Sequence, residues 1–244
     1  MEMETLILLT AGVFVIALLY SSVGHAGASG YIAVMSLLSL APAEIKPIAL
    51  ALNILVASIG SFQFWRAGHF SWSLFWPFAL LSVPFAFLGG YLNLPTQVFK
   101  VIVGIVLLIS AVQFLVRPPA EAEPHPPARP LAMGVGAGLG MLSGLTGTGG
   151  AIFLTPLLLF AHWMPTREAS GTSVAFVWIN SLTGLAGLMH ASGTLPQALP
   201  AWLGVVAVGA LLGTQFGLKW LPVRGLRRAL GVVLLIAAGK LLFA

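Results

Sequence analysis

The chain consists almost entirely of long apolar segments, interrupted only by charged residues or by glycine and proline. A hydrocarbon core about 30 Å thick is crossed by roughly 20 helical residues, and most of these segments reach that length. Since an open sheet edge cannot face lipid, we expect helices throughout, which predicts an all-α polytopic membrane protein. Ten segments follow in order: 4–23, 28–41, 46–66, 72–92, 96–116, 131–146, 149–163, 168–189, 197–218 and 226–243.

Composition excludes a soluble domain and several kinds of site. Charged residues make up 7% of the chain and hydrophobic residues 59%, whereas a soluble domain carries roughly 25% charged residues. We therefore expect a lipid bilayer around the protein. The net charge is +5, but the basic residues do not alternate with other polar residues along one face of a segment, so no nucleic-acid partner is expected. Cysteine, an HExxH motif and a Ser–His pair at usable spacing are all absent, so we expect neither an enzyme nor a bound metal or cofactor.

A proline-rich stretch divides the chain. The sequence RPPAEAEPHPPARP, at 117–130, contains six prolines and can form neither helix nor strand. We interpret it as a solvent-exposed linker between an N-terminal transmembrane repeat at 1–116 and a C-terminal one at 131–244. The two halves are expected to repeat one structure, as in many secondary transporters.

A glycine motif occurs in both halves at a fixed distance. Each copy directly precedes one of the two short segments, 28–41 and 149–163. Short, glycine-interrupted segments at corresponding places in two halves indicate a transporter binding site. Packing of helices through the glycines is the alternative interpretation. The first copy has Gly24, Gly27 and Gly30, and the second, 120 positions later, has Gly144, Gly147 and Gly150.

The chemistry of an interrupted helix favours an anion. The first backbone N–H groups of the next helix have no partners, and they carry partial positive charge that suits a small anion. Glycine, as at Gly149, lets the anion approach the backbone closely. Thr146 and Thr148 add hydroxyl donors, and Ser29 takes the equivalent place of Gly149 in the first half. We expect the two helix starts to face each other and to form one shared site.

Further polar residues belong to the predicted site. His25 would bind the anion when protonated, or act as a neutral donor at a helix start. Asn53 and Asn180, in the third segment of each half, would contact the substrate or hydrogen-bond between helices. Thr172 and Ser173 would line the site or bond back to their own helix. No acidic residue lies in the middle of a segment, so we expect no carboxylate proton relay.

The basic residues predict the orientation of the chain. If all ten segments cross, eight basic residues lie on one side and three on the other, and if the short segments turn back, the split is seven to four. The positive-inside rule favours the first arrangement, with the Lys219–Arg228 loop in the cytoplasm and both termini outside. Five crossings per half make the halves inverted relative to each other. Lys46 and Arg167, at segment starts, are expected to be interfacial anchors, with attraction of anions as the alternative.

Over nearly its whole length the sequence resembles the sulfite exporter TauE/SafE family of membrane permeases. The resemblance rests on GLTGTGGAIFLTPLLL at 144–159 and REASGTSVAFVWINSLTGL at 167–185, echoed by GHAGASGYIAVMSLLSL and RAGHFSW in the first half. The first-half motif has Ala28-Ser29 where the family usually has a fuller glycine run. The resemblance implies export or uptake of a small sulfur-containing anion, such as sulfite or an organosulfonate, across the bacterial inner membrane.

These observations predict a transporter that moves a small oxyanion by alternating access between two inverted halves. A channel lined by the glycine breaks, and a scaffold subunit in which the glycines only pack helices, are the alternatives. An anion that leaves an inside-negative cell gains about 2.3 kcal/mol per charge per 100 mV, so export would need no coupling ion. The sequence leaves the substrate, the direction and the oligomeric state open, a homo-oligomer included.

Overall fold

The computed structural model describes residues 3–22, 27–115, 123–192, 195–196, 199–217 and 223–243. Within these ranges the chain forms ten α-helices and no strand, which confirms the all-α class. Five of them, α1, α3, α4, α5 and α8, are long and apolar enough to cross a membrane. The helices are α1 (Met3–Ser22), α2 (Ala28–Leu37), α3 (Pro42–Arg66), α4 (Trp72–Tyr91), α5 (Thr96–Leu115), α6 (Arg129–Thr146), α7 (Ala151–Phe160), α8 (Thr166–Ser192), α9 (Leu199–Gly217) and α10 (Val223–Phe243).

The two short segments form the two shortest of these helices, α2 and α7, with 10 residues each. A helix of that length is about 15 Å long and covers half of the hydrocarbon core. In contrast, α3 begins earlier than expected, at Pro42 rather than at residue 46. Proline suits the first helical turn, and Glu44 Oε2 accepts a hydrogen bond from the Ala41 amide at 3.3 Å. Lys46 therefore lies inside the helix rather than at its start.

In the first half, α2 folds back along α1. A Cβ atom placed on Gly12 of α1 would meet Val34 of α2, and one placed on Gly30 of α2 would meet Ile16 of α1. Residue numbers thus fall on one helix as they rise on the other. The two helices form an antiparallel hairpin in which glycine provides the space for close packing.

In the second half, α6 and α7 form the corresponding hairpin. Gly150, just before α7, lies beside the backbone carbonyl of Leu139 in α6. The amide of His125, before α6, donates a hydrogen bond of 2.8 Å to the carbonyl of His162, after α7. Both open ends of this hairpin therefore lie at the same end of the bundle.

The first helix of each half packs against the fourth helix of the other half. Three glycines of α6 contact the α4 backbone directly, and both helices advance by four residues between contacts, so they run parallel. Gly209 and Gly213 of α9 contact the carbonyls of Phe14 and Leu18 in α1 in the same way. The α6 contacts are Gly136 with the carbonyl of Phe78, Gly140 with that of Ser82 and Gly144 with that of Ala86.

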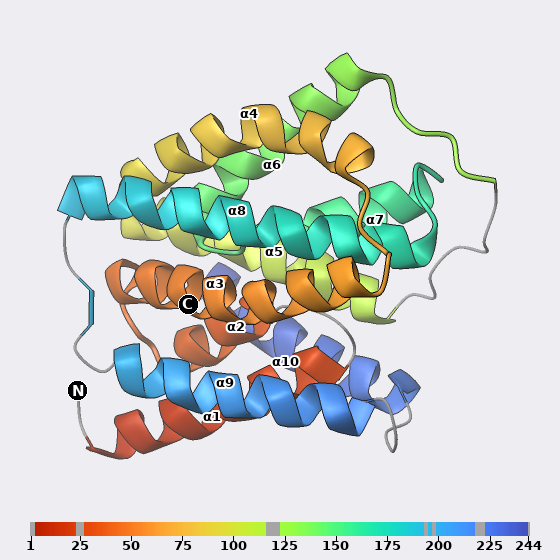
Figure 1. Cartoon of the computed structure of the whole chain (residues 1–244). Coiled ribbons are helices and arrows are strands. Elements are labelled where there is room, and N and C mark those ends of the chain that lie inside the picture. The colour runs from red at the N-terminus through yellow and green to blue at the C-terminus, as the bar shows by residue number, and fades with distance from the viewer. Residues whose placement is uncertain are drawn as a thin grey trace.

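The third helices of the two halves also pack together, in opposite directions. Gly60 of α3 meets Val174 of α8, and Leu50 of α3 meets Gly184 of α8. Figure 1 shows the result: α4, α6, α7 and α8 form one group of helices, α1, α2, α9 and α10 form a second, and α3 lies against α8 between them. Neither group belongs to one half of the chain, because α4 lies with helices of the second half, whereas α9 and α10 lie with helices of the first half, among them α5, which packs on α10.

Helix directions alternate along the chain. The two chain ends lie toward the left of Figure 1, and the segment before α6 lies at the right. Arg66 and Arg129 therefore lie at one end of the bundle, and Lys46 and Lys240 at the other. The described basic residues thus follow the arrangement in which all ten segments cross, with eight basic residues expected on one side and three on the other, and in which the halves have opposite orientation. The linker residues 116–122 and the loop residues 218–222 lie outside the described ranges.

Replacement of Gly140 by alanine is expected to destabilise the protein. The new Cβ would overlap the Ser82 carbonyl of α4, and forcing the helices apart costs roughly 1–3 kcal/mol. Gly138→Ala is the matched control, because Gly138 is exposed on the same helix with nothing within 4 Å, and alanine favours helix there. Melting temperatures of the purified proteins in detergent test this. Equal melting of both variants would show that close packing of α4 on α6 is not required.

Candidate functional site

The second glycine motif forms a tight reversal between α6 and α7, which we call the α6–α7 turn (residues 147–150). Gly147, Gly149 and Gly150 have φ angles of 81°, 73° and 87°. This left-handed conformation costs other residues about 1–2 kcal/mol each, so glycine is required at three of the four positions of the turn. The helix break predicted at this motif is present, and the glycines are needed for backbone conformation as well as for packing.

The α6–α7 turn is held between α3 and α8. On one side, Asn53 Nδ2 of α3 donates a hydrogen bond of 3.0 Å to the carbonyl of Gly147. On the other side, a Cβ atom placed on Gly149 would lie 2.6 Å from Val177 Cγ1 and 3.1 Å from Ser181 Oγ of α8. Asn53 and Ser181 are both completely buried, and both flank the turn near the middle of their helices.

The two threonines of the motif bond to each other. Thr146 Oγ1 donates to the carbonyl of Leu142 at 2.6 Å and lies 2.9 Å from Thr148 Oγ1. A hydroxyl has one proton, so Thr148 donates its proton to Thr146 and keeps none for a ligand. The prediction that these two hydroxyls donate to an anion is therefore not met in this conformation. They stiffen the turn instead.

Other donors at the turn have no partner. Within the described chain, the amides of Gly149, Gly150, Ala151 and Ile152 form no hydrogen bond to a protein acceptor, as expected for the first turn of a helix. Ser181 Oγ, which lies beside Gly149, is also buried without a partner. Buried polar groups are almost always satisfied in folded proteins, so this group of free donors indicates a place where a ligand or water binds.

Further buried polar atoms without partners surround the turn. Ser143 lies one helical turn before Gly147 in α6, and the side-chain oxygen of Asn53 is unpaired. Asn180 has neither its nitrogen nor its oxygen satisfied. Thr172 and Ser173 are likewise unpaired, but they lie about two turns further along α8. The structure thus places Asn53 at the turn and Asn180 beside Ser181 in sequence, whereas Thr172 and Ser173 are separated from them by the apolar residues 174–179 of α8.

Sequence reasoning missed Ser143 and Ser181. Ser143 begins the stretch that contains the motif, and Ser181 directly follows the predicted Asn180. Nothing local distinguishes such serines from those that bond back to their own helix, as Ser170 does to the Thr166 carbonyl at 2.9 Å.

The first-half motif is used differently. Gly27, with φ of 84°, caps α2, which begins one helical turn earlier relative to the motif than α7 does. Ser29 Oγ and Tyr20 OH form a buried hydrogen bond of 2.7 Å, and Gly30 packs against α1, so both residues join α2 to α1. Gly24 and His25 lie outside the described residues.

Lys46 is not the exposed interfacial anchor that the sequence predicted, because it is buried inside the bundle. Its Nζ donates to the carbonyls of Gly89 at 2.9 Å, Gly90 at 2.8 Å and Leu92 at 3.0 Å. These carbonyls end α4, where the helix dipole is negative and the groups lack helical partners. The buried ammonium therefore ties the start of α3 to the end of α4, close to the turn, where Gly147 lies against the Lys46 backbone.

Comparisons with known proteins identify the family of this chain. The family model described as sulfite exporter TauE/SafE matches residues 8–241. The "probable membrane transporter protein y4hK" of Sinorhizobium fredii is 41% identical over 235 residues, which cover 94% of this chain and 95% of that protein. No solved structure matches. The chain therefore belongs to the sulfite exporter TauE/SafE family.

Replacement of Lys46 by methionine is expected to lower the melting temperature in detergent. Three carbonyls at the end of α4 would lose their donor, and an unsatisfied buried group costs roughly 1–3 kcal/mol. Lys100→Met is the control, because Lys100 lies at the same end and donates to no described residue. If both variants melt alike, the contacts of Lys46 do not stabilise the fold.

Proposed function

We propose that this membrane transporter of the TauE/SafE family carries a small sulfur-containing oxyanion, such as sulfite or an organosulfonate, out of the bacterial cell across the inner membrane. The observation that carries the proposal is the group of unpaired amide and hydroxyl donors at the α6–α7 turn, beside Ser181. The family description and the matched relative support transport, and the family description supports a sulfur oxyanion as cargo.

The donor set at the turn favours an anion over a cation. Unpaired amides at the start of α7 carry the positive end of the helix dipole. Aspartate is absent from the chain, and the described glutamates, Glu4, Glu44, Glu123 and Glu168, lie at helix ends or in a loop. A cation in this part of the membrane would need carboxylates, whereas several amides and a hydroxyl suit an oxyanion, whose oxygens each accept hydrogen bonds.

The hairpins support alternating access as the mechanism of this proposal. The α1–α2 and α6–α7 hairpins enter the bundle from opposite ends, and among the described residues one side-chain hydrogen bond, from Asn53 to the Gly147 carbonyl, joins the α6–α7 turn to another helix. A shift of the α6–α7 hairpin relative to α3 and α8 would expose the turn to one end and then to the other. We place the end that carries Arg66, Arg129 and Arg228 in the cytoplasm, because basic residues gather on that side.

Replacement of Ser181 by alanine tests the site. The variant should lose the free hydroxyl at the turn, and a hydrogen bond to a charged ligand is worth about 1.5–3 kcal/mol, so the half-saturation concentration should rise roughly tenfold or more. Thr183→Val is the control on the same helix, because the Thr183 hydroxyl already bonds to the Ile179 carbonyl at 2.9 Å. Uptake into proteoliposomes is measured for sulfite, sulfoacetate, taurine, sulfate, nitrate and chloride.

The outcomes distinguish the alternatives. Saturable flux of one sulfur oxyanion that weakens in Ser181→Ala alone supports the proposal. Flux that does not saturate and shows no counterflow would indicate a channel. Absence of flux for every anion, in a protein that melts normally, would leave a scaffold role.

Transport is expected to be electrogenic and independent of proton and sodium gradients. The described helices contain no carboxylate in their middle turns that could carry a coupling ion, and an anion leaving a negative interior gains about 2.3 kcal/mol per charge per 100 mV. Currents in proteoliposomes clamped with potassium and valinomycin test this. A requirement for a proton or sodium gradient at fixed voltage would contradict uniport.

A further inference from the structure

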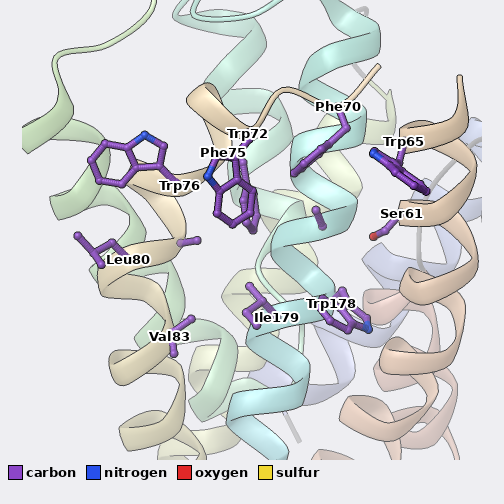
Figure 2. Close-up of a pocket in the computed structure, with 12 residues that line it drawn as sticks. Ser61, Trp65, Phe70, Trp72, Phe75, Trp76, Leu80, Val83, Trp178 and Ile179 are labelled. Atoms are coloured by element: carbon purple, nitrogen blue, oxygen red, sulfur yellow. The ribbon is translucent and has the colours of Figure 1, made fainter. Parts of the chain in front are cut away.

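An aromatic groove lies on the outside of the bundle, away from the α6–α7 turn. Its volume is about 700 Å³, and α8 forms its floor between walls made by α3 and α4 (Figure 2). Four of the seven tryptophans of the chain line it, and the turn between α3 and α4 contributes Phe70 at one end. The tryptophans are Trp65, Trp72, Trp76 and Trp178.

The groove faces the hydrocarbon of the bilayer. Leu80, in the middle of α4, is 51% exposed, and Trp178, in the middle of α8, is 38% exposed. Both belong to helices long enough to span the membrane. A groove of this size and lining, at this depth, is filled by hydrocarbon rather than by water.

Each wall of the groove carries an arginine at the same end. On the α4 side, Arg129 Cζ lies 5.6 Å above the ring of Trp76, which lines the groove. On the α3 side, Arg66 Cζ lies 5.7 Å above the ring of Phe62, which in turn contacts Trp65. Cation–π contact holds Arg129 against a ring that lines the groove, and it holds Arg66 against Phe62, which neighbours the lining residue Trp65. Within the described residues, neither forms an ion pair with a carboxylate.

We propose that the aromatic groove binds an anionic phospholipid of the surrounding bilayer. An acyl chain lies along the walls, and the phosphate group lies at the end of the groove that Arg66 and Arg129 flank. Basic pockets between transmembrane helices bind anionic lipid head groups, and guanidinium matches phosphate geometry. A second copy of the chain fits less well, because a two-fold axis along the membrane normal would bring the same arginines of both copies together.

Quenching of tryptophan fluorescence tests the proposal. The full-length protein is placed in neutral bilayers that contain a low fraction of phosphatidylglycerol or phosphatidylethanolamine with brominated acyl chains. Bromine quenches only tryptophans that it contacts, so the four tryptophans of the groove report on its occupant. The anionic lipid should quench at lower mole fraction, by about fivefold for each arginine, which corresponds to roughly 1 kcal/mol per basic residue.

Variants separate a specific site from general attraction to anionic lipid. Arg66→Gln combined with Arg129→Gln should abolish the preference for phosphatidylglycerol, while Arg228→Gln, an exposed arginine of α10 away from the groove, should preserve it. Equal quenching of the unmodified protein by both lipids would overturn the proposal, and so would a preference that survives in the double variant. Absence of quenching by either lipid would show that protein covers the groove, which also overturns it. The comparison of two lipids on the unmodified protein does not depend on the folding of any variant.

Discussion

Direct contact between helix backbones at glycine is the interaction on which this bundle depends. In a bilayer, apolar side chains gain nothing by leaving lipid for protein, so helices associate through close packing instead. Gly136, Gly140 and Gly144 bring α6 onto the carbonyls of α4, and Gly90 of α4 in turn meets the carbonyl of Gly184 in α8. These contacts fix α4 and α8 beside the α6–α7 hairpin. The position of the turn at its tip follows from them.

Two buried or partly buried lysines stabilise the fold and do not contribute their charge to the turn. Lys46 donates to the carbonyls that end α4, and Lys240 donates to the Leu37 carbonyl at 2.7 Å and to Ser39 Oγ at 2.8 Å, beyond the end of α2. The turn is left with amides and hydroxyls, which carry only partial charge. Such a site holds an anion weakly compared with a full cation, and a carrier must release its cargo as well as bind it.

The helices and the break between α6 and α7 could be predicted from the sequence, because each depends on the properties of a short segment alone. Bilayer thickness fixes the length of a spanning segment, and only glycine adopts φ angles between 73° and 87° at three of four successive positions without strain. Side-chain partners could not be predicted in the same way. The pairing of Thr146 with Thr148, of Ser29 with Tyr20 and of Lys46 with the end of α4 depends on which helices become neighbours. The packing of α4 on α6 and of α9 on α1, across the two halves of the chain, could not be predicted from any local feature of the sequence.

The packing of α9 on α1 has a consequence for how the protein is made. Trp202 Nε1 of α9 donates to Thr10 Oγ1 of α1 at 3.1 Å, across 192 positions of the chain, and Gly213 packs on the α1 backbone nearby. Synthesis proceeds from the N-terminus, so α1 enters the membrane long before its partner exists. The α4–α6 pair, in contrast, is complete once the first half and one more helix have emerged. The first helix to enter the membrane, α1, is therefore without its partner α9 for most of synthesis. The group of helices that contains α1 is the last to be completed.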